Sequence, residues 1–250
     1  MSETIGFNDA ISYYSIPNKY TGETIPGIPE APILRENLVK QLALADHFLR
    51  TNRHVQAALG QNVRIKIIDA FRPYEAQKYA YEVYWPIALK TMHPDWTDET
   101  VQKHLPDCCA KPEGHPTPTP HQTGGAVDVQ LWGLDDGKRI DLGYKGTLKE
   151  TAFPDFYEVF RMPRNYSEEE RKYRNTVLDL YKEHKDPFLA IKQVTQARRV
   201  LYYAMMEYAG LTVNPHEIWH FDLGDPLWGH MSGQRPYYGL PILPAWYKIG

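Results

Sequence analysis

Cysteine is scarce in this chain of 250 residues. The two cysteines, Cys108 and Cys109, are neighbours, and adjacent residues rarely reach the geometry of a disulfide bond with each other. A fold built on disulfides is therefore not expected, and a reducing compartment fits this cysteine usage. Because 42% of the residues are hydrophobic, a chain of this length can bury a core without such bonds.

Concentrated positive charge and long apolar runs are also lacking. The formal net charge is -3, the pI is near 6.4, and the 28 basic residues are spread along the chain. This distribution predicts no nucleic-acid partner and no anionic membrane surface as partner. No run approaches the roughly 18 apolar residues of a membrane span, and the first residues, MSETIGFNDAISYYS, do not resemble a signal peptide. We expect a cytoplasmic protein, whose oligomeric state the sequence leaves open.

The pattern of the chain predicts an α+β fold in one domain over residues 1–250. Residues 1–33 are predicted to form an N-terminal arm, and the aromatic and charged residues 155–190 an insertion. Apolar spacing and capping residues predict helices over 34–50, 74–90 and 190–210. Alternating patterns predict strands over 62–71, ending in a turn at Arg72-Pro73, over 124–132 and over 211–224. The proline-rich residues 91–120 are predicted to form a long loop. We expect a mainly antiparallel sheet with helices packed against it.

Asp128 is the first residue that calls for a chemical explanation. It lies in the strand-like run GGAVDVQLW, whose other face is apolar, so an unpaired carboxylate there would carry a cost of desolvation. It needs a cation, whether a metal, an arginine or several backbone donors. His121 precedes the two glycines of this run and is close enough along the chain to serve the same cation. The alternative is a loop histidine followed by an ordinary strand.

A second polar group lies far downstream in the segment HEIWH, residues 216–220. We interpret it as a strand rather than as the helical H-E-x-x-H zinc motif. Since side chains alternate along a strand, Glu217 and His220 can share one site only at a bend or a strand end. The alternative is an amphipathic strand with a buried tryptophan.

Together these segments offer a set of donors suited to zinc. Two histidines and one carboxylate leave a fourth coordination position open to water, and a glutamate beside them could accept the proton of that water. Composition alone does not establish that the distant segments meet.

Three separated motifs, DAFRP, HQTGGAVD and EIWHF, occur in this order between residues 69 and 221. They resemble the motifs of the zinc D-alanyl-D-alanine dipeptidases of the vancomycin-resistance type. These enzymes belong to a wider group of metallopeptidases that is related to lysostaphin-type enzymes and to the Hedgehog signalling domain. The family pattern H-x-x-G-x-A-x-D is matched from His121 to Asp128, and E-x-W-H from Glu217 to His220.

The resemblance implies a role for five residues and a Hedgehog-like or D-Ala-D-Ala peptidase-like fold. His121, Asp128 and His220 would bind Zn²⁺, and Glu217 would be the catalytic base. Arg72 would stabilise the oxyanion of the tetrahedral intermediate. The substrate would be a small peptide such as D-Ala-D-Ala.

Some positions depart from the family pattern. Thr119 stands where the family usually has serine, and Gln122-Thr123 where it often has serine-arginine. An aspartate that helps to hold the substrate ammonium group in the family is missing around Thr147. Glu150 or Asp155 would be the nearby carboxylates for this task, although solvated loop positions are the simpler interpretation.

These departures leave other functions open. A D,D- or L,D-carboxypeptidase acting on longer cell-wall peptides uses the same chemistry and does not require the missing aspartate. A non-catalytic, zinc-stabilised binding domain is a second alternative, but such a site needs neither Glu217 nor Arg72. An unrelated α+β domain is the third.

Overall fold

The computed structural model of the protein describes residues 24–29, 31–113, 117–143, 184–214 and 217–242, with the single residues 22, 168 and 182. Most of the predicted N-terminal arm and of the predicted insertion at 155–190 lies outside these residues. Thr147, Glu150 and Asp155 lie outside them as well.

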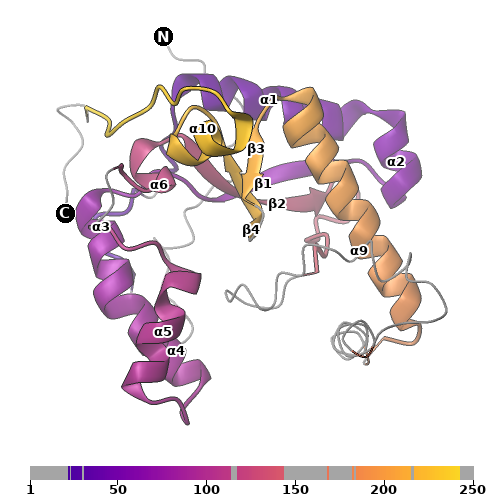
Figure 1. Cartoon of the computed structure of the whole chain (residues 1–250). Helices are drawn as coiled ribbons and strands as arrows, with labels where there is room; N and C mark the ends of the chain where they lie inside the picture. Colours follow the sequence, from indigo (N-terminus) through magenta and orange to yellow (C-terminus); the bar gives the residue numbers. More distant parts are fainter. Residues whose placement is uncertain are drawn as a thin grey trace.

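One antiparallel sheet organises the described part of the chain (Figure 1). Its strands are β1 Val63–Asp69, β2 Ala126–Gly133, β3 Thr212–Asn214 and β4 Glu217–Asp222. The spatial order is β1-β2-β4-β3, and each neighbouring pair is antiparallel. The predicted α+β class is confirmed at this level, while the Hedgehog-like fold remains a prediction.

Helices cover the apolar face of this sheet. They are α1 Glu36–Thr51, α2 Arg53–Leu59, α9 Pro187–Tyr202 and the π-helical segment η4 Tyr203–Tyr208 that continues α9. Leucines at helical spacing in α1, among them Leu38 and Leu42, are fully buried in one cluster with Val127 and Val129 of β2. Burial of each such side chain stabilises the fold by about 1.5–3 kcal/mol. The packing therefore places the apolar face of β2 against helices and leaves Asp128 on its other face.

A second hydrophobic cluster lies beyond the end of β1. It is formed by α3 Tyr74–Tyr79, the π-helical segment η2 Ala80–Tyr84, α4 Trp85–Met92 and α5 Asp98–Cys108. Figure 1 shows these helices extending away from the sheet. The helix predicted over 74–90 is confirmed. None of the described helices combines the length and apolar composition that crossing a membrane requires.

The prediction of a long loop over residues 91–120 is wrong, because α5 occupies its centre. Thr97 caps this helix by accepting a hydrogen bond from the amide of Thr100, and two acidic residues follow in the first turn. Val101 and Leu105, four residues apart, are buried in the second cluster. The many prolines of this segment favoured the prediction of a loop. Only Pro106 lies within the described helix, near its end.

The single strand predicted over residues 211–224 is also wrong. The segment forms two strands, β3 and β4, that pair with each other in antiparallel fashion. The apolar pattern of the sequence does not mark the break between these two strands. Two short helices, α6 Pro120–Thr123 and α10 Pro226–Ser232, lie directly before β2 and directly after β4.

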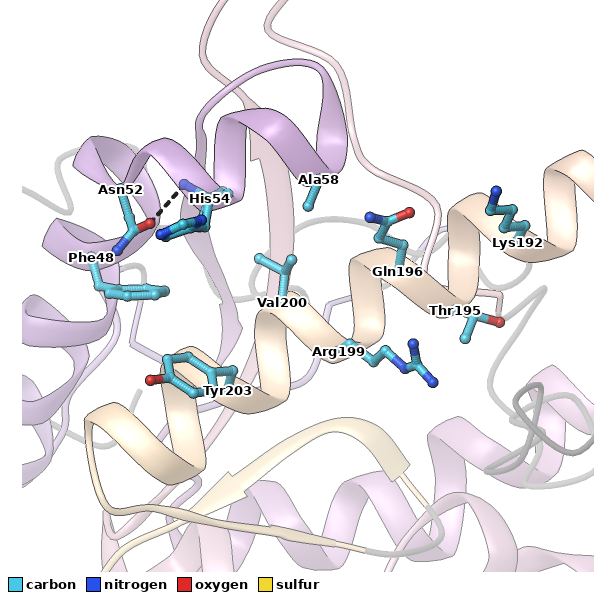
Figure 2. A pocket seen from close by; sticks show the side chains of 11 residues that line it. Phe48, Asn52, His54, Ala58, Lys192, Thr195, Gln196, Arg199, Val200 and Tyr203 are labelled. Carbon is cyan, nitrogen blue, oxygen red and sulfur yellow. Dashed lines mark hydrogen bonds between the residues drawn. The ribbon is translucent and has the colours of Figure 1, made fainter.

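A pocket of about 780 Å³ lies between the helices α1 and α2 and the helix α9 (Figure 2). Apolar side chains such as Val55, Val200 and Tyr203 line it together with polar ones such as Lys192. None of the residues assigned above to the metal or to catalysis lines this pocket. The candidate site is therefore a separate feature at the ends of β2 and β4.

Candidate metal centre and active site

His121 lies in the one-turn helix α6. Thr119 and Gln122 form a reciprocal capping box at its start, in which the backbone amide of Thr119 donates to Gln122 Oε1 over 2.9 Å. Gly124 ends the turn in the left-handed region, at a φ of 71°. Two of the residues that depart from the family pattern therefore have a structural role here, because they hold the helix that carries His121.

The next glycine brings β2 close to the end of β4. A Cβ atom on Gly125 would lie 2.7 Å from the carbonyl oxygen of Leu223, so no larger residue fits without a shift. The Leu223 amide donates to the Gly125 carbonyl over 2.8 Å. In the sheet register that follows, Asp128 pairs with His220 of β4 and with Asp69 of β1. The sheet itself thus places His220 beside Asp128.

Both histidine rings are oriented by an acceptor on the side away from Asp128. His121 Nδ1 lies 2.7 Å from the carbonyl oxygen of Ala70, and His220 Nε2 lies 2.8 Å from Asp222 Oδ1. An N–H donated to each acceptor leaves His121 Nε2 and His220 Nδ1 as lone-pair atoms. These two atoms are the ones that face Asp128, at 3.4 Å and 2.9 Å from its Oδ1.

The arrangement of these atoms fits a bound cation. The three side chains are largely buried, and their donor atoms all lie within 4.8 Å of one another. In a tetrahedral zinc site, bonds of about 2.0–2.2 Å place ligand atoms about 3.3–3.6 Å apart. Asp128 Oδ1 and His220 Nδ1 are buried without a hydrogen bond of acceptable geometry, although they are close together. A metal between them would satisfy both.

The electrostatics of the site also favour a positive charge. Burial raises the pKa of Asp128, but the nearby rings of His121 and His220 outweigh burial and hold this pKa well below its ordinary value. Burial lowers the pKa of His220, but Asp222 and Asp128 raise it well above its ordinary value. The carboxylates thus stabilise either a proton on His220 or a cation in its place.

A further fully buried carboxyl group, that of Asp225, lies near Asp222, the residue that orients His220. Burial and the nearby Asp222 raise the pKa of Asp225 to about 8, so it holds a proton at neutral pH. Its Oδ1 also accepts the amide of Trp228 and caps α10. A neutral Asp225 does not compete with the negative charge of Asp222, which lies 2.8 Å from His220 Nε2.

Glu217 reaches the site through an irregularity in the hairpin. From the pair Val213 with Phe221 to the pair Asn214 with Glu217, the register advances one residue along β3 but four along β4. Glu217 Oε2 consequently lies 3.5 Å from His220 Nδ1 and accepts a hydrogen bond of 2.9 Å from Asn214 Nδ2. This is the bend that a common site for Glu217 and His220 requires.

Arg72 lies at the opposite border of the site, between β1 and α3. Its amide donates to the carbonyl of His121 over 3.1 Å, and its Nε donates to Asp69 Oδ2 over 2.8 Å. Asp69 Oδ2 is in turn 4.0 Å from His121 Nδ1. Arg72 is therefore anchored to the same loop and the same carboxylate that surround a candidate metal ligand.

Several residues of the site were not predicted from the sequence. The position of Asp222 could have been predicted from the sequence, because it follows His220 by two residues and so lies on the same face of β4. The roles of Asn214 and of the Ala70 carbonyl could not have been predicted, since they depend on the irregular register of the hairpin and on backbone geometry. The letters HEIWH do match H-E-x-x-H, but Glu217–Asp222 is a strand, so the helical zinc motif does not apply.

Comparison with known proteins agrees with the motifs. A scan of the chain against profiles of known protein families finds no match. A curated protein from Synechocystis sp., named D-alanyl-D-alanine dipeptidase, is 29% identical to this chain over 224 residues. The matched region covers 83% of this chain and 78% of the relative.

Proposed function

Because this chain is related to the D-alanyl-D-alanine dipeptidases, we propose that it is a zinc-dependent peptidase that hydrolyses short D-amino-acid dipeptides such as D-Ala-D-Ala. One observation carries the proposal beyond the similarity. Segments far apart in the sequence bring His121, Asp128 and His220 within 4.8 Å of one another, with Glu217 next to them. A zinc-stabilised binding domain would not need this glutamate or the buried Arg72.

Each residue has a distinct part in the proposed reaction. A zinc ion held by the three ligands would polarise the scissile carbonyl and lower the pKa of a water molecule from 15.7 toward about 7. Glu217 accepts the proton of the attacking water and later donates it to the leaving amine. Its side chain is 23% exposed, so it can reach water and substrate, whereas that of His220 is 4% exposed.

Arg72 stabilises the negative charge that develops on the carbonyl oxygen of the substrate. A guanidinium keeps its charge at all relevant pH values, and a buried one acts where water does not screen it. Arg72 is 6% exposed. Asp69 balances this charge without removing the donors on the other nitrogens of the guanidinium.

The identity of the peptide is the part of the proposal that the sequence leaves most open. Since the aspartate that holds the ammonium group in the family is missing around Thr147, a carboxypeptidase acting on longer, blocked cell-wall peptides is the second candidate. The two candidates differ in whether a free amine is required.

The test is release of D-alanine from D-Ala-D-Ala and from N-acetyl-D-Ala-D-Ala by the zinc-loaded protein. The dipeptidase proposal predicts cleavage of the free dipeptide and little of the blocked one. Preferential cleavage of the blocked peptide would instead assign a carboxypeptidase. No cleavage of either, by protein that has bound zinc, would contradict both candidates.

A further inference from the structure

The guanidinium of Arg72 is held by a second side chain that has no role in the chemistry above. Gln77, in the first turns of α3, accepts a hydrogen bond from Arg72 Nη1 through its Oε1 over 2.8 Å. Together with the bond from Nε to Asp69, this fixes two different nitrogens. Because a guanidinium is planar and rigid, two such bonds define the orientation of the whole group.

Gln77 is itself held in place on its other side. Its Nε2 donates to the carbonyl oxygen of Ala110 over 2.6 Å and lies 3.2 Å from the sulfur of Cys109. The partners settle the orientation of the amide, since a carbonyl can only accept and a guanidinium can only donate. Gln77 is 1% exposed, so water does not replace these bonds. The residue therefore links Arg72 to the end of α5.

The third neighbour of this group is electrically neutral. Cys109 Sγ lies 4.0 Å from Arg72 Nη1, and burial raises the pKa of its thiol to about 11. The thiol therefore stays protonated at neutral pH. Of these three neighbours of the guanidinium, Asp69 supplies a negative charge, while Gln77 and Cys109 supply contacts without charge. Such surroundings hold the position of Arg72 without further reducing its positive field.

From this geometry we infer that Gln77 is a positioning residue that aims the Arg72 guanidinium at the substrate oxyanion. The inference rests on the proposed function, because it assumes that Arg72 acts on the transition state. A residue that acts only by aligning Arg72 has two consequences. Its removal lowers kcat with little change in KM, and the loss disappears when Arg72 is already absent.

The first experiment is a double-mutant cycle of Gln77→Met and Arg72→Ala. Methionine keeps the length of the side chain and removes its hydrogen bonds to Arg72, Cys109 and Ala110. We expect Gln77→Met to lower kcat about tenfold, in the range of couplings between contacting residues, with zinc content unchanged. In the Arg72→Ala background the same substitution should have no further effect. Gln56→Met, on the exposed surface of α2, is the matched control and should match the wild type.

Equal losses in both backgrounds, a change in KM alone or a wild-type kcat in Gln77→Met would overturn the inference. A second measurement does not depend on activity. In ¹⁵N-labelled protein, the two Nη groups of Arg72 should give separate NMR signals because rotation is hindered, and in Gln77→Met they should merge. Unchanged signals would contradict the inference even if the protein hydrolysed no peptide, whereas failure of the proposed function would appear as an inactive wild type with the expected signals.

Discussion

The candidate metal ligands and the candidate catalytic base are supported differently. The side chains of His121, Asp128 and His220 are 7%, 13% and 4% exposed, and buried acceptors orient both rings. Glu217 is more exposed and is oriented by the amide of Asn214. A metal site is stable when its ligands are fixed, but a base must reach water and substrate. Substitutions should therefore separate metal retention from turnover.

The largest separation is expected for Glu217→Ala. Removal of the base should lower kcat by about 10²–10⁴-fold, while the zinc content stays that of the wild type, because Glu217 is not assigned as a ligand. The measurement is D-alanine release and zinc content on the same sample. If the variant is purified without metal, Glu217 is a ligand and its assignment as the base is wrong. Glu99→Ala, on the exposed start of α5, is a suitable control.

A smaller effect in the same direction is expected for Arg72→Ala. Loss of one donor to an oxyanion typically costs about 10²–10³-fold in kcat. Steady-state kinetics with Arg53→Ala of α2 as the exposed control will measure it. Parallel losses of turnover and zinc would instead show that Arg72 supports the fold around His121 through Asp69.

The opposite pattern is expected for Asp222→Asn, which removes the charge behind His220. Carboxylates that orient a ligating histidine contribute about 10–100-fold to metal affinity. We predict a loss of zinc affinity in this range, measured by competition with a chelator, and near-normal kcat at saturating zinc. An unchanged affinity would mean that the charge of Asp222 does not strengthen the His220 ligand.

The last prediction concerns Asp225 and appears in stability rather than in turnover or metal affinity. Its pKa is raised from 3.8 to about 8 in the folded protein, so the protonated form is favoured by folding. The contribution is complete below pH 3.8 and is lost as the pH rises toward 8. Each pH unit in this window changes stability by at most about 1.4 kcal/mol, or about 3–6 °C in Tm for a chain of this size.

Asparagine in place of Asp225 stays neutral and still caps α10. The Tm of Asp225→Asn should therefore decline less than that of the wild type between pH 5 and pH 9. Thermal unfolding of the zinc-loaded proteins across this range is the measurement. Parallel curves for the two proteins would refute the raised pKa.

The sequence predicted which donor residues meet better than it predicted the contacts that hold them. The ligand types and their spacing are local properties, so HQTGGAVD and EIWHF identified the three donors that the structure brings together. Other features of the site depend on contacts between distant segments. They are the irregular register beside Asn214, the carbonyl of Ala70 that orients His121, and the side chains that hold Arg72. The capping box from Thr119 to Gln122 and the cap at Thr97 were readable locally, but the surrounding prolines favoured a loop.

The most direct test of the account is zinc binding by the wild type and by Asp128→Ala, measured as metal per chain together with the X-ray absorption spectrum. We predict one tightly bound zinc ion per wild-type chain, coordinated by two imidazoles and at least one oxygen, and loss of that ion in Asp128→Ala. Zinc bound in equal amount with an unchanged spectrum in the variant would contradict the assignment of His121, Asp128 and His220 as the metal centre.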